Sequence, residues 1–483
     1  MAATDSPLRA LAESRSRWFE HLAEFVSIPS VSSERRHADD VRRAATWLRS
    51  RVRDAGIQSA TLIETAGAPV VWGEWAVSSR APTVLMYGHY DVVSPGDERS
   101  WSSPPFVPVT RQGFMYGRGA SDDKGPLLIQ LSAVQAWAKA YGRPPVNILC
   151  LYEGEEEVGS PQLQRLLRAG RLPRQAAGAV DAVLVCDTRM LAARRPALIV
   201  GLRGALAAQI EVRGSARDVH SGAFGGLVAN PSNELAALVA SLHDRDGRVA
   251  IDGFYRDVKA PTHAHRDPAA ERLVAQQLLS HAGPRLSKGE RGFTAYERGT
   301  LRPSLDVVNL AAGQAGGAGG ATIPRRAVAK LSFRLVPSQD PQRVARLLQQ
   351  HVAFRAGTGV TVRTTFSKPA KPVAISPRRA VVGAAEAALL SGFGYPPALL
   401  RSGGTIPVVQ LFAARVAVPV LMGFARPDDG MHGPNERVDL AALAAGGRSL
   451  VHFLSLMSKL RTHARRPASV GPYTPTHTFA DVH

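Results

Sequence analysis

Short apolar runs alternate with segments of helical spacing between residues 8 and 187. Turn-forming residues flank these runs, which is typical of strands that are buried in a sheet. The runs predict strands at 61–64, 69–76, 83–88, 146–153 and 182–187. Apolar residues three and four positions apart predict helices at 8–25, 38–55, 126–141 and 161–168. A buried helix is the alternative for a run such as 146–151. The alternation as a whole predicts an α/β fold with a mainly parallel sheet that is flanked by helices.

The pattern changes after residue 203. Alternating strands and separate helices predict an inserted α+β domain at 204–372, which divides a first domain into segments 1–203 and 373–460. Within the insertion, a helix is predicted at 231–243, strands are predicted at 205–214, 305–310 and 327–336, and the glycine-rich stretch 313–324 is predicted to be a loop. Returning helices at 376–394 and 439–460 and a strand at 418–424 complete the first domain. The tail 461–483 has no core pattern and is predicted to be disordered.

The formal net charge of +19 raises nucleic-acid binding as a possible function. However, the arginines are dispersed through alanine-rich helices, and no nucleic-acid-binding motif accompanies them. We therefore expect a solvated basic surface and no nucleic-acid partner. Two cysteines, Cys150 and Cys186, exclude a disulfide framework. No apolar run approaches the ~20 residues that span a bilayer, and no secretory signal is visible, so a cytoplasmic protein without a membrane partner is expected.

Five segments that carry acidic or histidine residues follow predicted strands or occupy turns. They read YGHYD at 87–91, GRGASDDKG at 117–125, EGEEEVGS at 153–160, VCDT at 185–188 and MHGPNE at 431–436. Each segment alone could be a solvated turn. The carboxyl ends of parallel strands meet at one edge of a sheet, so we expect the five segments to converge there. Their oxygen and imidazole donors predict a site for two divalent metals, zinc in the first place.

The spacing within these segments suggests individual roles. His89 and Asp91 are two residues apart and share one face of a strand, so Asp91 can support His89 as a metal ligand. A carboxylate of the pair Asp122 and Asp123 can bridge two cations. Three adjacent glutamates at 155–157 are costly without a nearby positive charge, and one of them can ligate while its neighbour acts as a general base.

The ordered motifs HxD, GRGxxDDKG, EGxEExGS and HGPNE resemble those of the M20 family of dinuclear zinc peptidases and deacylases, over roughly residues 15–460. The chain is most similar to the cytosolic and carnosinase-like dipeptidases of that family. The resemblance implies a fold like that of dinuclear zinc exopeptidases, with the insertion serving as a lid and dimerisation domain. It also implies that Asp122 bridges two metals, with Glu156 as the general base and Asp91 orienting His89. The implied metal ligands are His89, Asp122, Asp187, Glu157 and His432.

Further roles follow from the resemblance outside these motifs. His220 would reach the site of a partner subunit and stabilise the oxyanion there. Independently of the resemblance, Arg334 is a candidate to bind the substrate carboxylate, because a guanidinium binds it through two hydrogen bonds; the alternative is a surface arginine of a strand. Gly403, Gly404 and Thr405 are candidates to contact the peptide terminus, with a plain turn as the alternative. Thr405 stands where a serine is expected in some relatives and keeps the hydroxyl. The Asp122–Asp123 peptide is expected to be cis.

These observations predict a dinuclear metal-dependent hydrolase that cleaves the amide bonds of dipeptides or short peptides through a metal-bound hydroxide. The alternative is an N-acyl-amino-acid deacylase with the same site. The expected cofactors are two zinc ions, with manganese or cobalt as alternatives. The expected partners are a small peptide substrate and a second copy of the chain in a homodimer.

Overall fold

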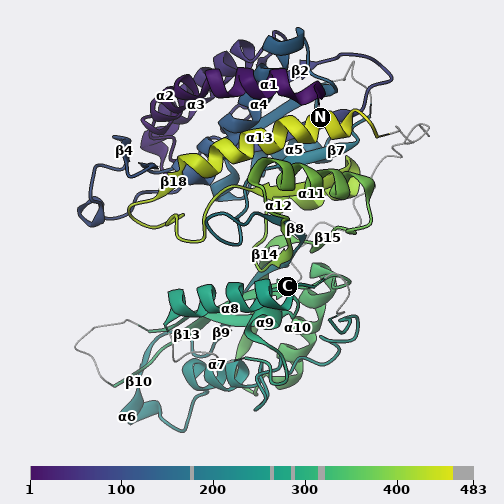
Figure 1. The fold of residues 1–483 in the computed structure, drawn as a ribbon. Helices are drawn as coiled ribbons and strands as arrows, with labels where there is room; N and C mark the ends of the chain where they lie inside the picture. The colour runs from purple at the N-terminus through teal and green to yellow at the C-terminus, as the bar shows by residue number, and fades with distance from the viewer. Residues whose placement is uncertain (1, 174–178, 262–265, 284–288, 314–320, 461–483) are drawn as a thin grey trace.

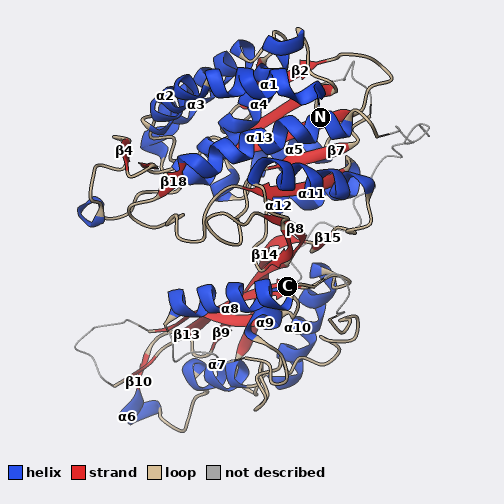
Figure 2. Cartoon of the chain, in the orientation of Figure 1, coloured by secondary structure: helices blue, strands red, loops and turns tan. Residues whose placement is uncertain are grey.

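The computed structural model describes residues 2–173, 179–261, 266–283, 289–313 and 321–460. Two bodies lie one above the other in Figure 1, and helices cover the sheet of each body (Figure 2). The predicted tail 461–483 and most of the predicted loop 313–324 lie outside the described residues.

A nine-stranded sheet forms the centre of the upper body, with the strand order β1-β2-β6-β3-β7-β17-β8-β15 and with β16 paired to β8. Its strands are β1 (Thr61–Ile63), β2 (Val70–Trp75), β3 (Thr83–His89), β6 (Asn147–Glu153), β7 (Ala182–Val185), β8 (Ala197–Leu202), β15 (Val373–Ala374), β16 (Ala398–Ser402) and β17 (Val418–Gly423). A separate three-stranded sheet contains β4 (Val109–Arg111), β5 (Phe114–Tyr116) and β18 (Arg437–Asp439).

The four central strands β6, β3, β7 and β17 are parallel to one another, which confirms the predicted α/β fold. Every residue of β3 and β6 is buried, as expected for strands that are covered on both faces. The pairs β1–β2, β2–β6 and β17–β8 are antiparallel. The sheet is therefore mixed at its margins, a detail that the apolar runs could not reveal because they carry no direction.

Eight helices, counted over the described residues, surround this sheet. They are α1 (Ala2–Glu13), α2 (Arg15–Val26), α3 (Ala38–Asp54), α4 (Gly125–Tyr141), α5 (Pro161–Arg168), α11 (Ala380–Phe393), α12 (Pro407–Arg415) and α13 (Leu440–Met457). The single helix predicted at 8–25 is in fact two, because the chain leaves the helix at Ser14. The Ser14 hydroxyl donates to the Ala10 carbonyl at 2.7 Å, beside the Ser14 N–H at 3.2 Å, and such an added side-chain bond often bends a helix.

Helix α13 is apolar and long enough to span a membrane by length and composition, but 72% of it is buried inside the protein. It packs against α4, α11 and α1. Its apolar character is therefore explained by its place in the core.

The lower body contains a four-stranded antiparallel sheet with the order β11-β13-β9-β14. Its strands are β9 (Gly204–Arg213), β11 (Ser304–Ala312), β13 (Arg326–Leu335) and β14 (Thr361–Ala370). Helices α7 (Pro231–Ala240) and α10 (Pro341–Arg355) cover this sheet and share a second hydrophobic core with it. The remaining elements of this segment are β10 (Val219–His220), α6 (Ser221–Phe224), α8 (Pro268–Ala282), α9 (Ala295–Thr300) and β12 (Thr322–Ile323).

The chain passes between the two sheets at Arg203, between β8 and β9, and returns between β14 and β15. We therefore propose 204 and 372 as the limits of the inserted domain. Within that domain, Ala270 of α8 and Tyr296 of α9 are buried in the core of the upper body. These two helices consequently tie the insertion to the domain that it interrupts.

Candidate metal centre

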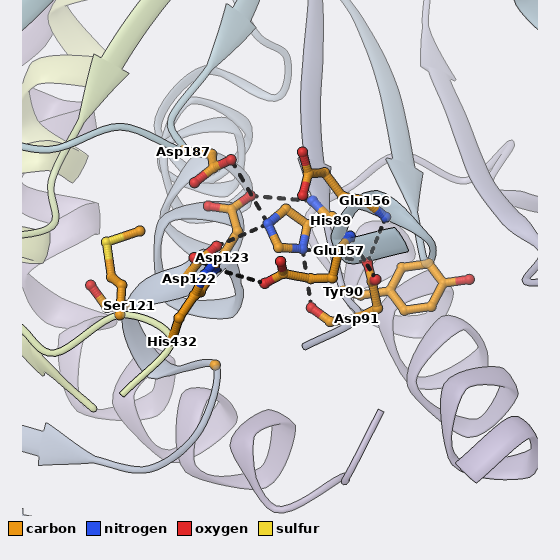
Figure 3. A network of polar contacts seen from close by, with 12 residues as sticks. His89, Tyr90, Asp91, Ser121, Asp122, Asp123, Glu156, Glu157, Asp187 and His432 are labelled. Carbon is orange, nitrogen blue, oxygen red and sulfur yellow. Dashed lines mark hydrogen bonds and ion pairs between the residues drawn. The ribbon is translucent and has the colours of Figure 1, made fainter. Parts of the chain in front are cut away.

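The five chemically distinctive segments come together at the carboxyl ends of the central strands (Figure 3). His89 is the last residue of β3, and Asp187 lies two residues beyond β7. Asp122 lies in the short π-helical turn Ala120–Lys124 that leads into α4, Glu157 lies in the 3-10 turn Glu156–Val158 after β6, and His432 lies in the turn after β17. Parallel strands deliver their ends to one edge, and this edge is where the sequence predicted the site.

Asp122 lies between the two histidines and presents a different oxygen to each. His89 Nε2 is 3.0 Å from Asp122 Oδ1 and 3.8 Å from Asp187 Oδ2. His432 Nε2 is 2.9 Å from Asp122 Oδ2 and 3.3 Å from Glu157 Oε1. The arrangement consists of two donor sets that share one carboxylate, which is the geometry of a bridging ligand.

The donor atoms fit divalent cations. Donors that share a tetrahedral zinc at ~2.0–2.1 Å lie about 3.3 Å apart, within the range of the separations found here. Ligand atoms of His89, Asp122 and Glu157 all lie within 4.8 Å of one another. Glu157 Oε1 is buried and receives no well-formed hydrogen bond in the described part of the chain, so it has a lone pair available for a cation.

Electrostatics also indicate that the site requires positive charge. Contacts with Asp122 and Glu157 raise the pKa of His432 to about 10. Burial, followed by repulsion from Asp122, raises the pKa of Asp187 to about 7. Burial also opposes ionisation of Asp122, but hydrogen bonds from His432 and His89 outweigh burial and lower the pKa of this carboxyl. Protonated imidazoles thus compensate the carboxylate charges, a task that bound cations can perform instead.

Asp91 supports more of the site than the resemblance implied. His89 Nδ1 lies 3.0 Å from the backbone oxygen of Asp91 and 3.4 Å from its carboxylate Oδ1. The carboxylate itself accepts hydrogen bonds from the backbone N–H groups of Glu156 and Glu157, each at 3.1 Å. Asp91 therefore orients the imidazole and also fixes the turn that carries two glutamates.

The three adjacent glutamates have separate roles in the structure. Glu155 accepts hydrogen bonds from the backbone of Ala68 and Gln162 and joins a neighbouring loop to the start of α5. Glu157 faces His432. Burial, with repulsion from Asp187 and Glu157, raises the pKa of Glu156 well above its usual range, although His89 opposes the shift. Glu156 is therefore the one of the three with an environment suited to a general base.

The sequence reasoning did not assign a role to Glu436 and Arg118, although both stand in the quoted motifs. Glu436 is fully buried and accepts hydrogen bonds from the backbone of Gly119, Ser121 and Asp122 at 2.9, 3.0 and 3.1 Å. Arg118 donates to Glu436 at 2.7 Å and to the Gly433 carbonyl at 3.0 Å. This pair joins the turn of Asp122 to the turn of His432. The presence of charged residues in the same motifs as the candidate ligands was the only signal for these roles. The sequence does not reveal which backbone groups such residues contact.

Replacing Glu436 with glutamine is expected to lower zinc affinity by about 10- to 100-fold, because one of the two oxygens that accept from the turn of Asp122 becomes an NH2 donor and the negative charge paired with Arg118 is lost. Titration calorimetry with Zn²⁺ alone measures this effect. Glu290→Gln is the matched control, since Glu290 forms a buried pair with Arg302 far along the chain from these turns. The control should lose thermal stability without losing zinc affinity. Equal zinc affinity in the Glu436 variant and the wild type would contradict the prediction.

The residues predicted to contact substrate lie outside this cluster. Arg334 Nη1 donates to Thr405 Oγ at 3.1 Å, so the structure brings these two together. Gly404 lies next to them in the turn after β16, where its N–H donates to Ser402 Oγ. His220 belongs to β10, which lies with α6 at the far end of the lower body (Figure 1). Its exposed side chain has no contact with the metal cluster. The peptide between Asp122 and Asp123 is cis, as expected.

Comparison with known proteins extends this description. The model of Peptidase family M20/M25/M40 matches residues 85–456. The Cys-Gly metallodipeptidase of Schizosaccharomyces pombe is 30% identical over 97% of this chain and 99% of the relative. The Beta-Ala-His dipeptidase of Mus musculus is 30% identical over 83% of this chain and 82% of the relative.

Solved structures are similar over almost the whole chain. The dipeptidase Dug1p of Saccharomyces cerevisiae has a TM-score of 0.78 at 28% identity and covers 95% of this chain and 99% of its own. Human carnosine dipeptidase 1 has a TM-score of 0.77 at 26% identity and covers 95% of this chain and 100% of its own.

Proposed function

The chain belongs to peptidase family M20/M25/M40, and from this membership we propose that it is a metallopeptidase that hydrolyses dipeptides with the help of divalent metals. The observation that carries the proposal is the position of Asp122, whose two oxygens face His89 and His432. Relatives that are similar over most of their length are named as dipeptidases, which supports small peptides as substrates.

We propose two zinc ions as the cofactors. His89, Asp122 and Asp187 would hold one ion, and Asp122, Glu157 and His432 would hold the other. When bound, such ions lower the pKa of a water molecule and polarise the scissile carbonyl. Imidazole and carboxylate donors suit zinc, while manganese and cobalt accept the same donors and are the alternatives to test.

The protein's own residues then perform three tasks. Glu156 takes a proton from the attacking water and passes it to the leaving amine, while Asp91 holds the backbone of Glu156 in place. Arg334, with Thr405, binds the carboxylate of the substrate, because a guanidinium can bind a carboxylate through two parallel hydrogen bonds. The Gly404 N–H lies in the same turn and can contact the peptide terminus.

A paired assay on the purified protein tests the proposal. Elemental analysis gives the metal content, and a dipeptide panel is run beside N-acetyl-amino acids with and without a chelator. About two metals per chain and chelator-sensitive cleavage of dipeptides would support it. Cleavage of acyl-amino acids alone would assign the chain to the deacylases. Absence of turnover with every added metal would overturn the catalytic assignment.

We further propose that the chain acts as a homodimer through the inserted domain. Val308 and Leu310 of β11 are 63% and 58% exposed, and Leu227, after α6, is 78% exposed. Strand β11 is an edge strand, because β13 is its only partner among the described strands. Apolar side chains along an unpaired strand edge favour association with another chain.

Mixing two inactive variants tests whether His220 works in the partner subunit. His220→Ala and Glu156→Gln should each be inactive alone. When equal amounts are refolded together, about half of the dimers are mixed, and one of the two sites in each mixed dimer combines both intact residues. About a quarter of the wild-type turnover should therefore return. Light scattering measures the mass in parallel. A monomeric mass or the absence of restored turnover would contradict the proposed role.

A further inference from the structure

Arg203 is the single residue that connects β8 of the upper sheet with β9 of the lower sheet. Its side chain donates to three backbone carbonyls that belong to two other segments. Nε donates to Gly403 at 3.2 Å, and Nη1 donates to Arg298 and Arg302 at 3.3 Å each. The guanidinium therefore joins the turn after β16 to the residues around the end of α9.

Thr405 connects Arg203 to the candidate substrate arginine. The Thr405 hydroxyl donates to the backbone oxygen of Arg203 at 2.6 Å and accepts from Arg334 Nη1 at 3.1 Å. A hydroxyl can donate once and accept at the same time, so one threonine links both residues. Any shift of the turn at Thr405 would move Arg334 with it.

The turn has little freedom to move. A side chain at Gly403 would place its Cβ 2.3 Å from the Gly299 carbonyl oxygen and 3.0 Å from Arg203 Nη2. Only glycine allows this close approach of two backbones. Arg203 thus fixes a turn that already lies against α9.

Arg203 and Arg334 carry positive charges that no carboxylate contacts directly among the described residues. Neither residue forms an ion pair with a carboxylate in the part of the chain that the structure describes. Burial, and then repulsion from Arg334, lowers the pKa of Arg203 to about 10, while Asp306 opposes the shift. Two neighbouring guanidiniums that form no direct ion pair favour an anion between or beside them.

We infer that Arg203 is a positioning residue that makes the enzyme select peptides with a free C-terminal carboxylate. Its guanidinium holds Gly403 and with it the turn of Thr405, whose hydroxyl accepts from Arg334. The guanidinium also adds a second positive charge to the subsite. The inference rests on the proposed peptidase function and assigns to that function a basis for its specificity. A merely structural arginine would stabilise the fold without affecting the choice between a free and a blocked terminus.

The test compares one dipeptide with its C-terminal amide in Arg203→Met, Arg203→Lys and the wild type. Arg203→Met should raise KM for the free acid by about 10- to 100-fold and should change the amide far less, so the preference for the acid falls. Arg203→Lys keeps the charge but not the planar fork, and it should recover part of the preference. Bound metal, measured by elemental analysis, should be unchanged in both variants.

Arg401→Met is the matched control. Arg401 lies in β16 beside the same turn, and its guanidinium makes no hydrogen bond within the described residues. The control removes one charge and should keep the wild-type preference. If Arg203→Met does not fold, Arg203→Gln replaces it, because the glutamine amide keeps one donor group for the backbone carbonyls but carries no charge.

The outcomes distinguish this inference from the proposed function. A wild-type protein that cleaves dipeptides, together with an Arg203→Met variant that loses acid and amide turnover equally, would overturn the inference and leave the function intact. An unchanged acid preference in Arg203→Met would do the same. A wild-type protein that cleaves neither substrate would overturn both. A selective loss for the acid, absent from Arg401→Met, would support the inference.

Discussion

Replacing Glu156 with glutamine is expected to lower kcat by about 10²- to 10⁴-fold while bound metal and thermal stability remain close to wild type. Glutamine preserves the shape of the side chain but cannot take up a proton. The backbone N–H of Glu156 still donates to Asp91, so the turn should keep its conformation. Steady-state kinetics on a dipeptide measure the loss, and elemental analysis of the same sample measures the metal.

Glu155→Gln provides a neighbouring control for this prediction. Glu155 binds the backbone of Ala68 and Gln162 and does not face the metal cluster, so kcat should change only a few-fold. The lost charge at the start of α5 should cost about 1 kcal/mol of stability. Turnover retained by Glu156→Gln, or equal losses in both variants, would disprove the assignment of the base.

Replacing Asp122 with alanine should have the second large effect, the loss of metal from both donor sets. Each set retains only its histidine and one other carboxylate, because Asp122 supplies one oxygen to each imidazole partner. We expect less than one metal per chain after dialysis and turnover near the level of the chelated wild type. Elemental analysis and calorimetry with Zn²⁺ measure the change without relying on activity.

Asp123→Asn is the matched control for Asp122→Ala. Asp123 is buried beside Asp122, but its carboxylate accepts a hydrogen bond from the backbone of His89 and does not face His432. This variant should keep its metal. An Asp122→Ala protein that retains two metals per chain would refute the bridging role.

The sequence predicted the sheet edge at which the site lies, because the strand and the residues that follow it are adjacent in the chain. An apolar run such as TVLMYG identifies a buried strand, and the residues that follow it, His89 and Asp91, must then lie at the strand's carboxyl end. Glycine–proline at 125–126 likewise identified the start of α4. Resemblance to a family then assigned individual roles that spacing alone had left open.

Other features could not be predicted because they depend on contacts between distant segments. Glu436 meets the backbone of Ser121 and Asp122 more than 300 positions earlier in the chain, and no local pattern reveals such a pairing. The separate roles of the three glutamates depend on a turn whose conformation is fixed by Asp91. The antiparallel margins of the sheet were also invisible, since an apolar run reads the same in either strand direction.

The joining of Arg118 to Glu436 has a consequence for biosynthesis. A nascent chain leaves the ribosome from its N-terminus, and its domains fold as they emerge. His89, Asp122, Glu157 and Asp187 are therefore made long before His432 and Glu436, which follow the whole inserted domain. The proposed donor set of His89, Asp122 and Asp187 is therefore available early, whereas the proposed set that includes His432 is completed only late in synthesis. On the proposed assignment, a two-metal centre can form only after nearly the whole chain has been made.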